Sequence, residues 1–212
     1  MARRMSDPAF KADQWQRRYD PHIGPINRYV DEIRTQGLGW VPYNAPSHGG
    51  VEARVLSILR DPGPATQDVD GGSGFLCVEN DDPSAELQCA QLEQAGLTAA
   101  DLLPWNAYPW YINRKPNGPE LLLGLPTIMR LLELAPKIEV VLLQGADAQK
   151  SWQMLIKHHN EVVQSHALVT VDSYHPGKQA LFTPDPAERA RRAERRFEAF
   201  REVADILTNP QN

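Results

Sequence analysis

The stretch Ile138-Glu139-Val140-Val141-Leu142-Leu143, which runs into Gln144-Gly145, decides the fold. An apolar run with a single polar residue is typical of a strand that is buried on both faces, as central strands of parallel sheets are. The glycine marks a turn, and residues from about 146 to 157 have the composition of a helix. A buried strand that leads directly into a helix favours an α/β fold.

The same alternation of strand and helix recurs along the chain. Further strands are expected at residues 53–59, 101–105 and 167–171, and helices at 10–19, 23–35, 84–95, 119–134 and 186–207. Gly124 and Pro126 indicate that the helix at 119–134 is kinked or begins only at Pro126. We predict a three-layer α/β/α sandwich around a central, mostly parallel four-stranded sheet.

Composition narrows the class of protein. The 212 residues are 23% charged and 42% hydrophobic, which is ordinary for one globular domain. We expect residues 1–50 to form a helical extension packed on an α/β domain at 51–212. The net charge of −5 means that nucleic-acid binding requires a local basic patch.

Location and cofactors are also constrained. No apolar run approaches the roughly 20 residues of a membrane span, and the basic N-terminus lacks the apolar core of a secretory signal. Two cysteines are too few for a four-cysteine metal or iron–sulfur site within one chain. We therefore expect a cytoplasmic protein without metal, cofactor or membrane contact.

Three polar residues each follow an expected strand. They are Asp61 in Leu59-Arg60-Asp61-Pro62-Gly63-Pro64, Asn106 in Leu103-Pro104-Trp105-Asn106-Ala107-Tyr108-Pro109-Trp110-Tyr111, and His175 in Tyr174-His175-Pro176-Gly177. Taken singly, each is explained as a turn former or a cap. Because the carboxyl ends of parallel strands meet at one rim, the three together predict a site for one small polar ligand.

The residue types suit a reaction in which charge separates. A carboxylate such as Asp61 can hold a water or stabilise a developing cation. The Asn106 amide offers a donor beside an acceptor, which matches an imide or amide edge. His175 can donate to an oxygen that gains negative charge, and Phe75 offers a flat surface for stacking.

In order and spacing, these motifs resemble the uracil-DNA glycosylase superfamily. Members carry a short proline motif after a strand, GQDPYH in the uracil-specific branch, GINPG in the mismatch branch and GEAPG in the iron–sulfur branch; here it is Leu59-Arg60-Asp61-Pro62-Gly63-Pro64. Phe75 after Gly72-Ser73-Gly74 is similar to the stacking aromatic. Leu102-Leu103-Pro104-Trp105-Asn106 and His175-Pro176-Gly177 are similar to the later motifs. The resemblance runs from about residue 51 to about residue 207.

The resemblance implies a mechanism and a set of roles. The target nucleotide is flipped out of the duplex, because a stacked base is out of reach. Phe75 stacks on the base, Asn106 pairs with its O4 and N3 edge, and His175 donates towards O2. Asp61 stabilises the positive sugar and orients the attacking water, while Arg60 and Gly63 line the base pocket.

Departures from the family motifs raise a question of selectivity. Gly63 stands where GQDPYH has the tyrosine that excludes thymine, so the pocket is roomier or is closed by another residue, such as Tyr108 or Trp110. Leu59 replaces the leading glycine.

For DNA contacts we expect Arg114, Lys115 and Lys178 at phosphates and Leu181 as the wedge, with Gln179 as the next candidate. The arginines of the helix at 186–207 alternate with glutamates, which favours a solvated surface over a nucleic-acid patch.

We therefore expect a monomeric DNA repair glycosylase that hydrolyses the N-glycosidic bond of uracil in single- or double-stranded DNA and leaves an abasic site. Three alternatives stay open. One is a broader glycosylase for deaminated or mismatched bases. Another is a DNA-binding member with weak turnover that captures the base or the abasic product. The third is an N-glycosidase acting on free nucleosides or other small molecules.

Overall fold

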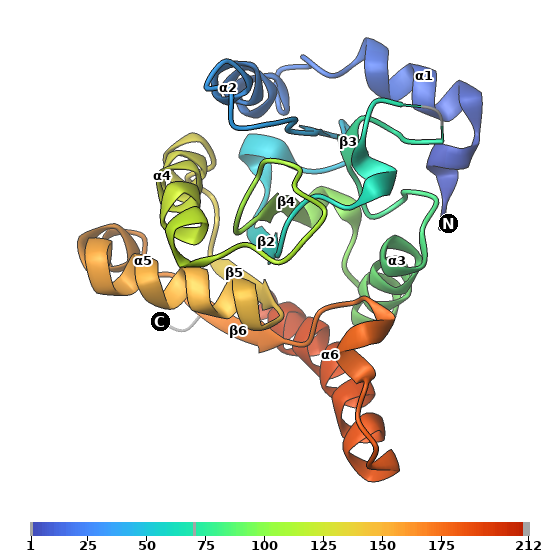
Figure 1. Ribbon diagram of the computed structural model, residues 1–212, viewed down its shortest axis with the longest axis vertical. Coiled ribbons are helices and arrows are strands. Elements are labelled where there is room, and N and C mark those ends of the chain that lie inside the picture. The colour runs from blue at the N-terminus through green and yellow to red at the C-terminus, as the bar shows by residue number, and fades with distance from the viewer. Residues whose placement is uncertain (1, 70, 210–212) are drawn as a thin grey trace.

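A computed structural model describes residues 2–69 and 71–209 of the chain. Its central sheet has four parallel strands in the order β4-β2-β5-β6 (Figure 1). They are β2 (Val55–Leu59), β4 (Leu102–Asn106), β5 (Val140–Gln144) and β6 (Val169–Ser173). The expected parallel sheet and α/β/α sandwich are confirmed.

Alternating side chains of the strands enter two separate cores. Val55 of β2 and Val140 of β5 face a core that includes Leu92 and Phe200. Their neighbours Leu56 and Val141 face a larger core on the other side of the sheet. This alternation follows from the two-residue period of a strand and explains why the central strands read as continuous apolar runs.

Helices cover both faces of the sheet. On one side lie α3 (Pro83–Ala95) and α6 (Pro186–Thr208), which pack against each other, and on the other lie α4 (Gly118–Leu134) and α5 (Ala146–Ser165), also neighbours (Figure 1). The α4 helix is continuous through Pro126, and Gly124 is required within it, because a Cβ there would lie 1.9 Å from the carbonyl oxygen of Ala107. The α5 helix is longer than expected and has a non-helical residue at His159.

Residues before β2 form α1 (Pro8–Gln16), α2 (Gly24–Arg34) and the short strand β1 (Tyr43–Asn44), which pairs in parallel with β3 (Phe75–Leu76). Neither of these two-residue strands was expected from the pattern of residues, because two residues are too few to show an alternation. Short 3₁₀ turns occur at Arg4–Ser6, Gly50–Glu52, Pro64–Thr66, Ala99–Asp101 and Lys178–Leu181.

In the described part of the chain, no helix combines the length and apolar character that a membrane crossing requires.

Candidate functional site

A cavity of about 430 Å³ lies at the carboxyl ends of the strands and brings the three polar motifs together. Asp61 follows β2, Asn106 ends β4 and His175 follows β6, and all three line this cavity. Arg60 and Gly63 also line it. After β2, the chain adds β4 on one side of it and then β5 on the other, so the order of the strands reverses at β2. In an open parallel sheet, ligands bind at such a reversal.

Asp61 is a buried carboxylate beside a partly exposed arginine. Its side chain is 3% exposed and accepts a hydrogen bond from Nε of Arg60. Burial raises the pKa of Asp61 above its ordinary value, and the Arg60 guanidinium opposes this rise. Because the backbone N–H of Tyr108 donates to the Arg60 carbonyl (3.0 Å), the turn that carries both side chains is fixed to the end of β4.

Asn106 presents a buried amide with an unused acceptor. The residue is 2% exposed, and within the described chain its Oδ1 has no hydrogen-bond partner. Asn106 pairs in register with Leu59, and the next N–H, of Ala107, donates to the Leu59 carbonyl (2.8 Å). The backbone is therefore rigid, and a buried carbonyl oxygen of this kind is costly unless a ligand donates to it.

The imidazole of His175 is neutral with a defined tautomer. Its Nδ1 accepts a hydrogen bond from the backbone N–H of Gly177 (2.9 Å), so the ring proton lies on Nε2. Desolvation lowers the pKa of His175 to about 4, and the nearby charges of Arg60 and Arg196 act in the same direction. The ring is thus a neutral donor at physiological pH.

Two contacts fix the loop that carries His175. Gly145, at φ +106°, allows the loop to approach closely, because a Cβ there would lie 3.0 Å from the Cβ of His175. Arg196 of α6 is 3% exposed, and its Nη2 donates to the carbonyl oxygens of His175 and Gly177. Most arginines of α6 do form exposed pairs with glutamates, but Arg196 is an exception that its sequence context did not distinguish.

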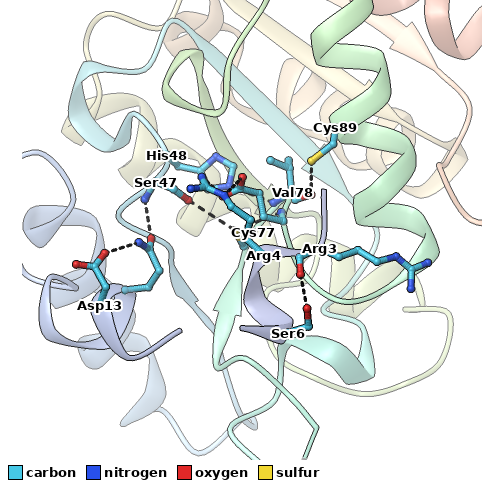
Figure 2. Close-up of polar contacts among 11 residues, drawn as sticks. Arg3, Arg4, Ser6, Asp13, Ser47, His48, Cys77, Val78 and Cys89 are labelled. Carbon is cyan, nitrogen blue, oxygen red and sulfur yellow. Dashed lines mark hydrogen bonds and ion pairs between the residues drawn. The ribbon is translucent and has the colours of Figure 1, made fainter. Parts of the chain in front are cut away.

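The opposite wall of the cavity comes from the end of β3 and the segment that leads from it to α3, and the lining residues there are Leu76, Cys77, Val78 and Asn80. The backbone of Val78 is held on both sides: its N–H donates to Nε2 of His48 (3.2 Å), and its carbonyl accepts from the Cys89 thiol (2.8 Å). Figure 2 shows these contacts. Nδ1 of His48 forms a hydrogen bond with the Ala99 carbonyl oxygen (3.1 Å), so His48 is a structural residue of this wall.

The N-terminal segment supports the same wall from behind. Arg4 forms two hydrogen bonds to the buried carboxylate of Glu79, at 2.6 and 2.7 Å, and the N–H of Met5 donates to the Glu79 carbonyl. Figure 2 shows Arg4 beside Cys77. Residues close to the start of the chain therefore help to shape the cavity.

Phe75 does not occupy the expected position. Its ring is fully buried and packs edge-on against Trp15, at 4.9 Å between ring centroids, and also contacts Tyr43. It is absent from the cavity lining, where its neighbour Leu76 lies instead. Successive side chains of a strand point to opposite faces, so β3 turns Phe75 towards the N-terminal helices and Leu76 towards the cavity. In this structure the Phe75 ring therefore does not face the cavity, and its expected stacking on a ligand stays a prediction.

The space at Gly63 is open. Apart from Gly63 itself and its two chain neighbours, no atom of the described residues lies within 4 Å of the position that a Cβ on Gly63 would occupy. Tyr108 and Trp110 do not close it, because both are buried in the larger core and neither lines the cavity. The indole N–H of Trp110 donates to the Ile33 carbonyl (3.3 Å), which fixes the ring in the core. Tyr108 and Trp110 are therefore core residues.

A second cavity, of about 470 Å³, adjoins the first and shares Arg60 and His175 with it. Lys178 and Gln179 line this second cavity, which also includes Asp147. Lys115 forms an ion pair with Asp147 (3.4 Å).

The other expected DNA contacts lie at the surface. Arg114 is exposed but bonds to Glu120, within the N-terminal cap of α4. Leu181 is partly buried, whereas the next residue, Phe182, is 88% exposed. This loop therefore presents a large apolar side chain to solvent at Phe182, and the position of Phe182 beside threonine and proline gave no sign of its exposure.

No group of His, Cys, Asp or Glu side chains in residues 2–69 and 71–209 is arranged to hold a metal ion. No protein-family model matches the chain, and no curated protein matches its sequence. What the site does therefore has to be argued from its chemistry.

Proposed function

We propose that this protein is a DNA glycosylase that hydrolyses the N-glycosidic bond of uracil and leaves an abasic site. The motif order resembles that of the uracil-DNA glycosylase superfamily. The observation that carries the proposal is the unpartnered, buried Oδ1 of Asn106, in one cavity with the Asp61 carboxylate and the neutral His175 ring. An imide edge offers the N–H donor that this oxygen lacks, next to a carbonyl.

In the proposed reaction, the flipped uracil enters the cavity with its N3–H on Oδ1 of Asn106. As the glycosidic bond breaks, negative charge grows on the base and positive charge on the sugar. The Nε2–H of His175 donates to the base oxygen O2 and stabilises the anion. Because the proton of the neutral His175 ring already lies on Nε2, the ring can donate this hydrogen bond without first gaining or losing a proton.

Asp61 acts on the sugar side. Its carboxylate stabilises the cationic sugar and orients the water that attacks it, and burial strengthens both effects because little solvent screens them. The Arg60 guanidinium favours the ionised form of this carboxylate and so opposes the effect of burial on its pKa.

On the DNA side, we propose that Lys178 and Gln179 contact the strand where it passes the second cavity and that Phe182 enters the gap left by the flipped base. Arg114 and Lys115 contribute less, because each is already paired with a carboxylate. We propose that the protein works as a cytoplasmic monomer.

The test uses end-labelled oligonucleotides that contain one uracil opposite guanine or in a single strand, followed by alkali. Strand scission at uracil supports the proposal, provided that thymine in the same position stays intact. A gel shift without scission indicates a binding protein with little turnover. No effect on DNA together with base release from free nucleosides would refute the DNA assignment.

A broader base range is the second candidate, and the open space at Gly63 favours it. Hypoxanthine and xanthine placed in the same oligonucleotides decide this point. Scission at these bases at rates within about tenfold of uracil supports the broad glycosylase.

A further inference from the structure

Asn80 is a second buried amide in the cavity, and the sequence motifs gave it no role. It lies in the segment between β3 and α3, is 2% exposed, and lines the same cavity as Asn106. Its backbone is held in a tight turn, with its N–H on the Cys77 carbonyl (3.2 Å) and its carbonyl accepting from the N–H of Asp82 (2.8 Å). The side chain therefore projects from a fixed point.

The orientation of the Asn80 amide follows from its one hydrogen bond. Nδ2 donates to the backbone carbonyl of Phe75 (2.9 Å). Because a carbonyl oxygen is an acceptor only, the amide nitrogen has to face it, which leaves Oδ1 as the free atom. Among the described residues, this Oδ1 is buried and has no hydrogen-bond partner.

The cavity thus contains two buried acceptors without donors, Oδ1 of Asn80 and Oδ1 of Asn106. Uracil linked to a sugar carries one N–H, at N3, which the proposed pairing with Asn106 uses. A second buried carbonyl oxygen without a donor costs roughly 1–3 kcal/mol, and a ligand group that donates to it recovers part of this cost. The open space at Gly63 gives a larger base room to do so.

We infer that Asn80 reads a second hydrogen-bond donor on the base. Bases that carry an amino, hydroxyl or further ring N–H group beyond the imide bind more tightly than uracil-like bases without one. This inference rests on the proposed function, which identifies the ligand as a nucleic-acid base. It adds that the cavity prefers those bases that carry a second hydrogen-bond donor.

The experiment measures binding of bases to the full chain by calorimetry, in two matched pairs whose glycosidic nitrogen carries a methyl group in place of the sugar and therefore has no N–H. 1-Methyl-5-hydroxymethyluracil against 1-methylthymine adds a hydroxyl donor to a pyrimidine, and 9-methylguanine against 9-methylhypoxanthine adds an amino donor to a purine. We expect the donor-bearing member of at least one pair to bind about tenfold more tightly, which corresponds to one buried hydrogen bond. The pair that shows the preference identifies the ring size.

Asn80→Leu should reduce that ratio to about one, whereas the matched control Asn106→Leu should weaken both members of a pair and leave their ratio unchanged. Binding of the donor-free member of each pair should be the same in Asn80→Leu as in the unmodified protein, which guards against a misfolded leucine variant. A ratio near one for both pairs in the unmodified protein, an unchanged ratio in Asn80→Leu, or no binding of any of the four bases would overturn the inference.

Oligonucleotide cleavage separates this inference from the proposed function. Scission at uracil with no preference in either pair refutes the role of Asn80 alone. If the donor-bearing bases bind more tightly in a way that depends on Asn80, but no oligonucleotide is cut, the glycosylase proposal is refuted and the role of Asn80 in binding the base stands.

Discussion

Asp61 combines deep burial with a charge, and this has opposite consequences for stability and for activity. Because its pKa is raised in the folded protein, the ionised carboxylate lowers stability at neutral pH. We expect Asp61→Asn to slow base release by about 10²–10³-fold, the usual effect of removing one well-placed electrostatic group. The midpoint of thermal unfolding should stay the same or rise.

Single-turnover cleavage and a melting curve on the same preparation check this prediction. Asp68→Asn is the matched control, since Asp68 lies exposed in the loop that follows the motif. Full activity in Asp61→Asn would remove Asp61 from the mechanism.

His175 predicts the shape of the pH profile. An ordinary histidine is half protonated near pH 6.5, but the pKa of His175 is lowered to about 4. The neutral donor form therefore persists on the acid side, and the single-turnover rate should be level from pH 8 to pH 6. It should fall only below that range, where His175 gains a proton. A decline centred near pH 6.5 contradicts the assigned environment of His175.

Among the elements, α6 contacts the His175 loop most directly through Arg196, which binds the backbone carbonyls of His175 and Gly177. Arg196→Met removes the donor to two backbone carbonyls, at a cost of roughly 1–3 kcal/mol for each one left buried. We expect kcat for base release to fall about tenfold with little change in KM, because the loop positions His175 but does not hold the DNA.

Two further variants interpret that result. Arg196→Lys should restore part of kcat, since lysine can donate to the same oxygens. Arg201→Met, which removes an exposed pair with Glu194 on the same helix, should leave kcat unchanged. Equal effects on kcat of Arg196→Met and Arg201→Met would mean that the loop positions His175 without Arg196.

The contact between α4 and the loop after β4 depends on a missing side chain. Gly124→Ala places a methyl group 1.9 Å from the Ala107 carbonyl oxygen, so one of the two backbones has to move. We expect a loss of roughly 1–3 kcal/mol in the free energy of unfolding in urea. Gly118→Ala, in the first turn of the same helix with no described atom within 4 Å of its Cβ, should be neutral or slightly stabilising.

For the whole molecule, buried neutral histidines predict a loss of stability in acid. Desolvation lowers the pKa of His48 to about 4, so between pH 6.5 and pH 4 the unfolded chain binds a proton that the folded chain does not. Stability therefore falls as the pH falls through this window, by roughly 3 kcal/mol from His48.

His48→Gln tests this account. Glutamine offers a donor for the Ala99 carbonyl and an acceptor for the Val78 N–H, but it does not titrate. Urea unfolding at pH 7 and pH 4.5 should show a smaller difference for the variant than for the unmodified protein. An equal difference in the two proteins would show that His48 is not responsible.

Much of the architecture was predictable because it depends on local patterns. The run at residues 138–143 is apolar because β5 supplies both cores, and Asp61, Asn106 and His175 follow strands whose ends meet at one rim. Their placement required only the strand order. The catalytic roles stay predictions.

The errors and omissions depend on tertiary context. Phe75 and Leu76 are adjacent apolar residues, and which one faces the cavity depends on the pairing of two strands that are each only two residues long. Arg196 is one of six arginines in α6, and its contacts with the His175 loop set it apart from those paired with glutamates. Asn80 is distinguished only by the bond to Phe75 and by the burial of its free oxygen.

The hold of Arg196 on the His175 loop also bears on how the protein is made. Asp61, Asn106 and His175 all precede Arg196 in the chain, so ribosomes finish the three reactive motifs before they reach the residue that fixes one of them. A nascent chain that has not yet released α6 carries the reactive side chains without their final geometry. Such a chain should release the base more slowly than the finished protein, because His175 is not yet positioned, and the full rate of the proposed reaction should be reached only after translation has passed residue 196.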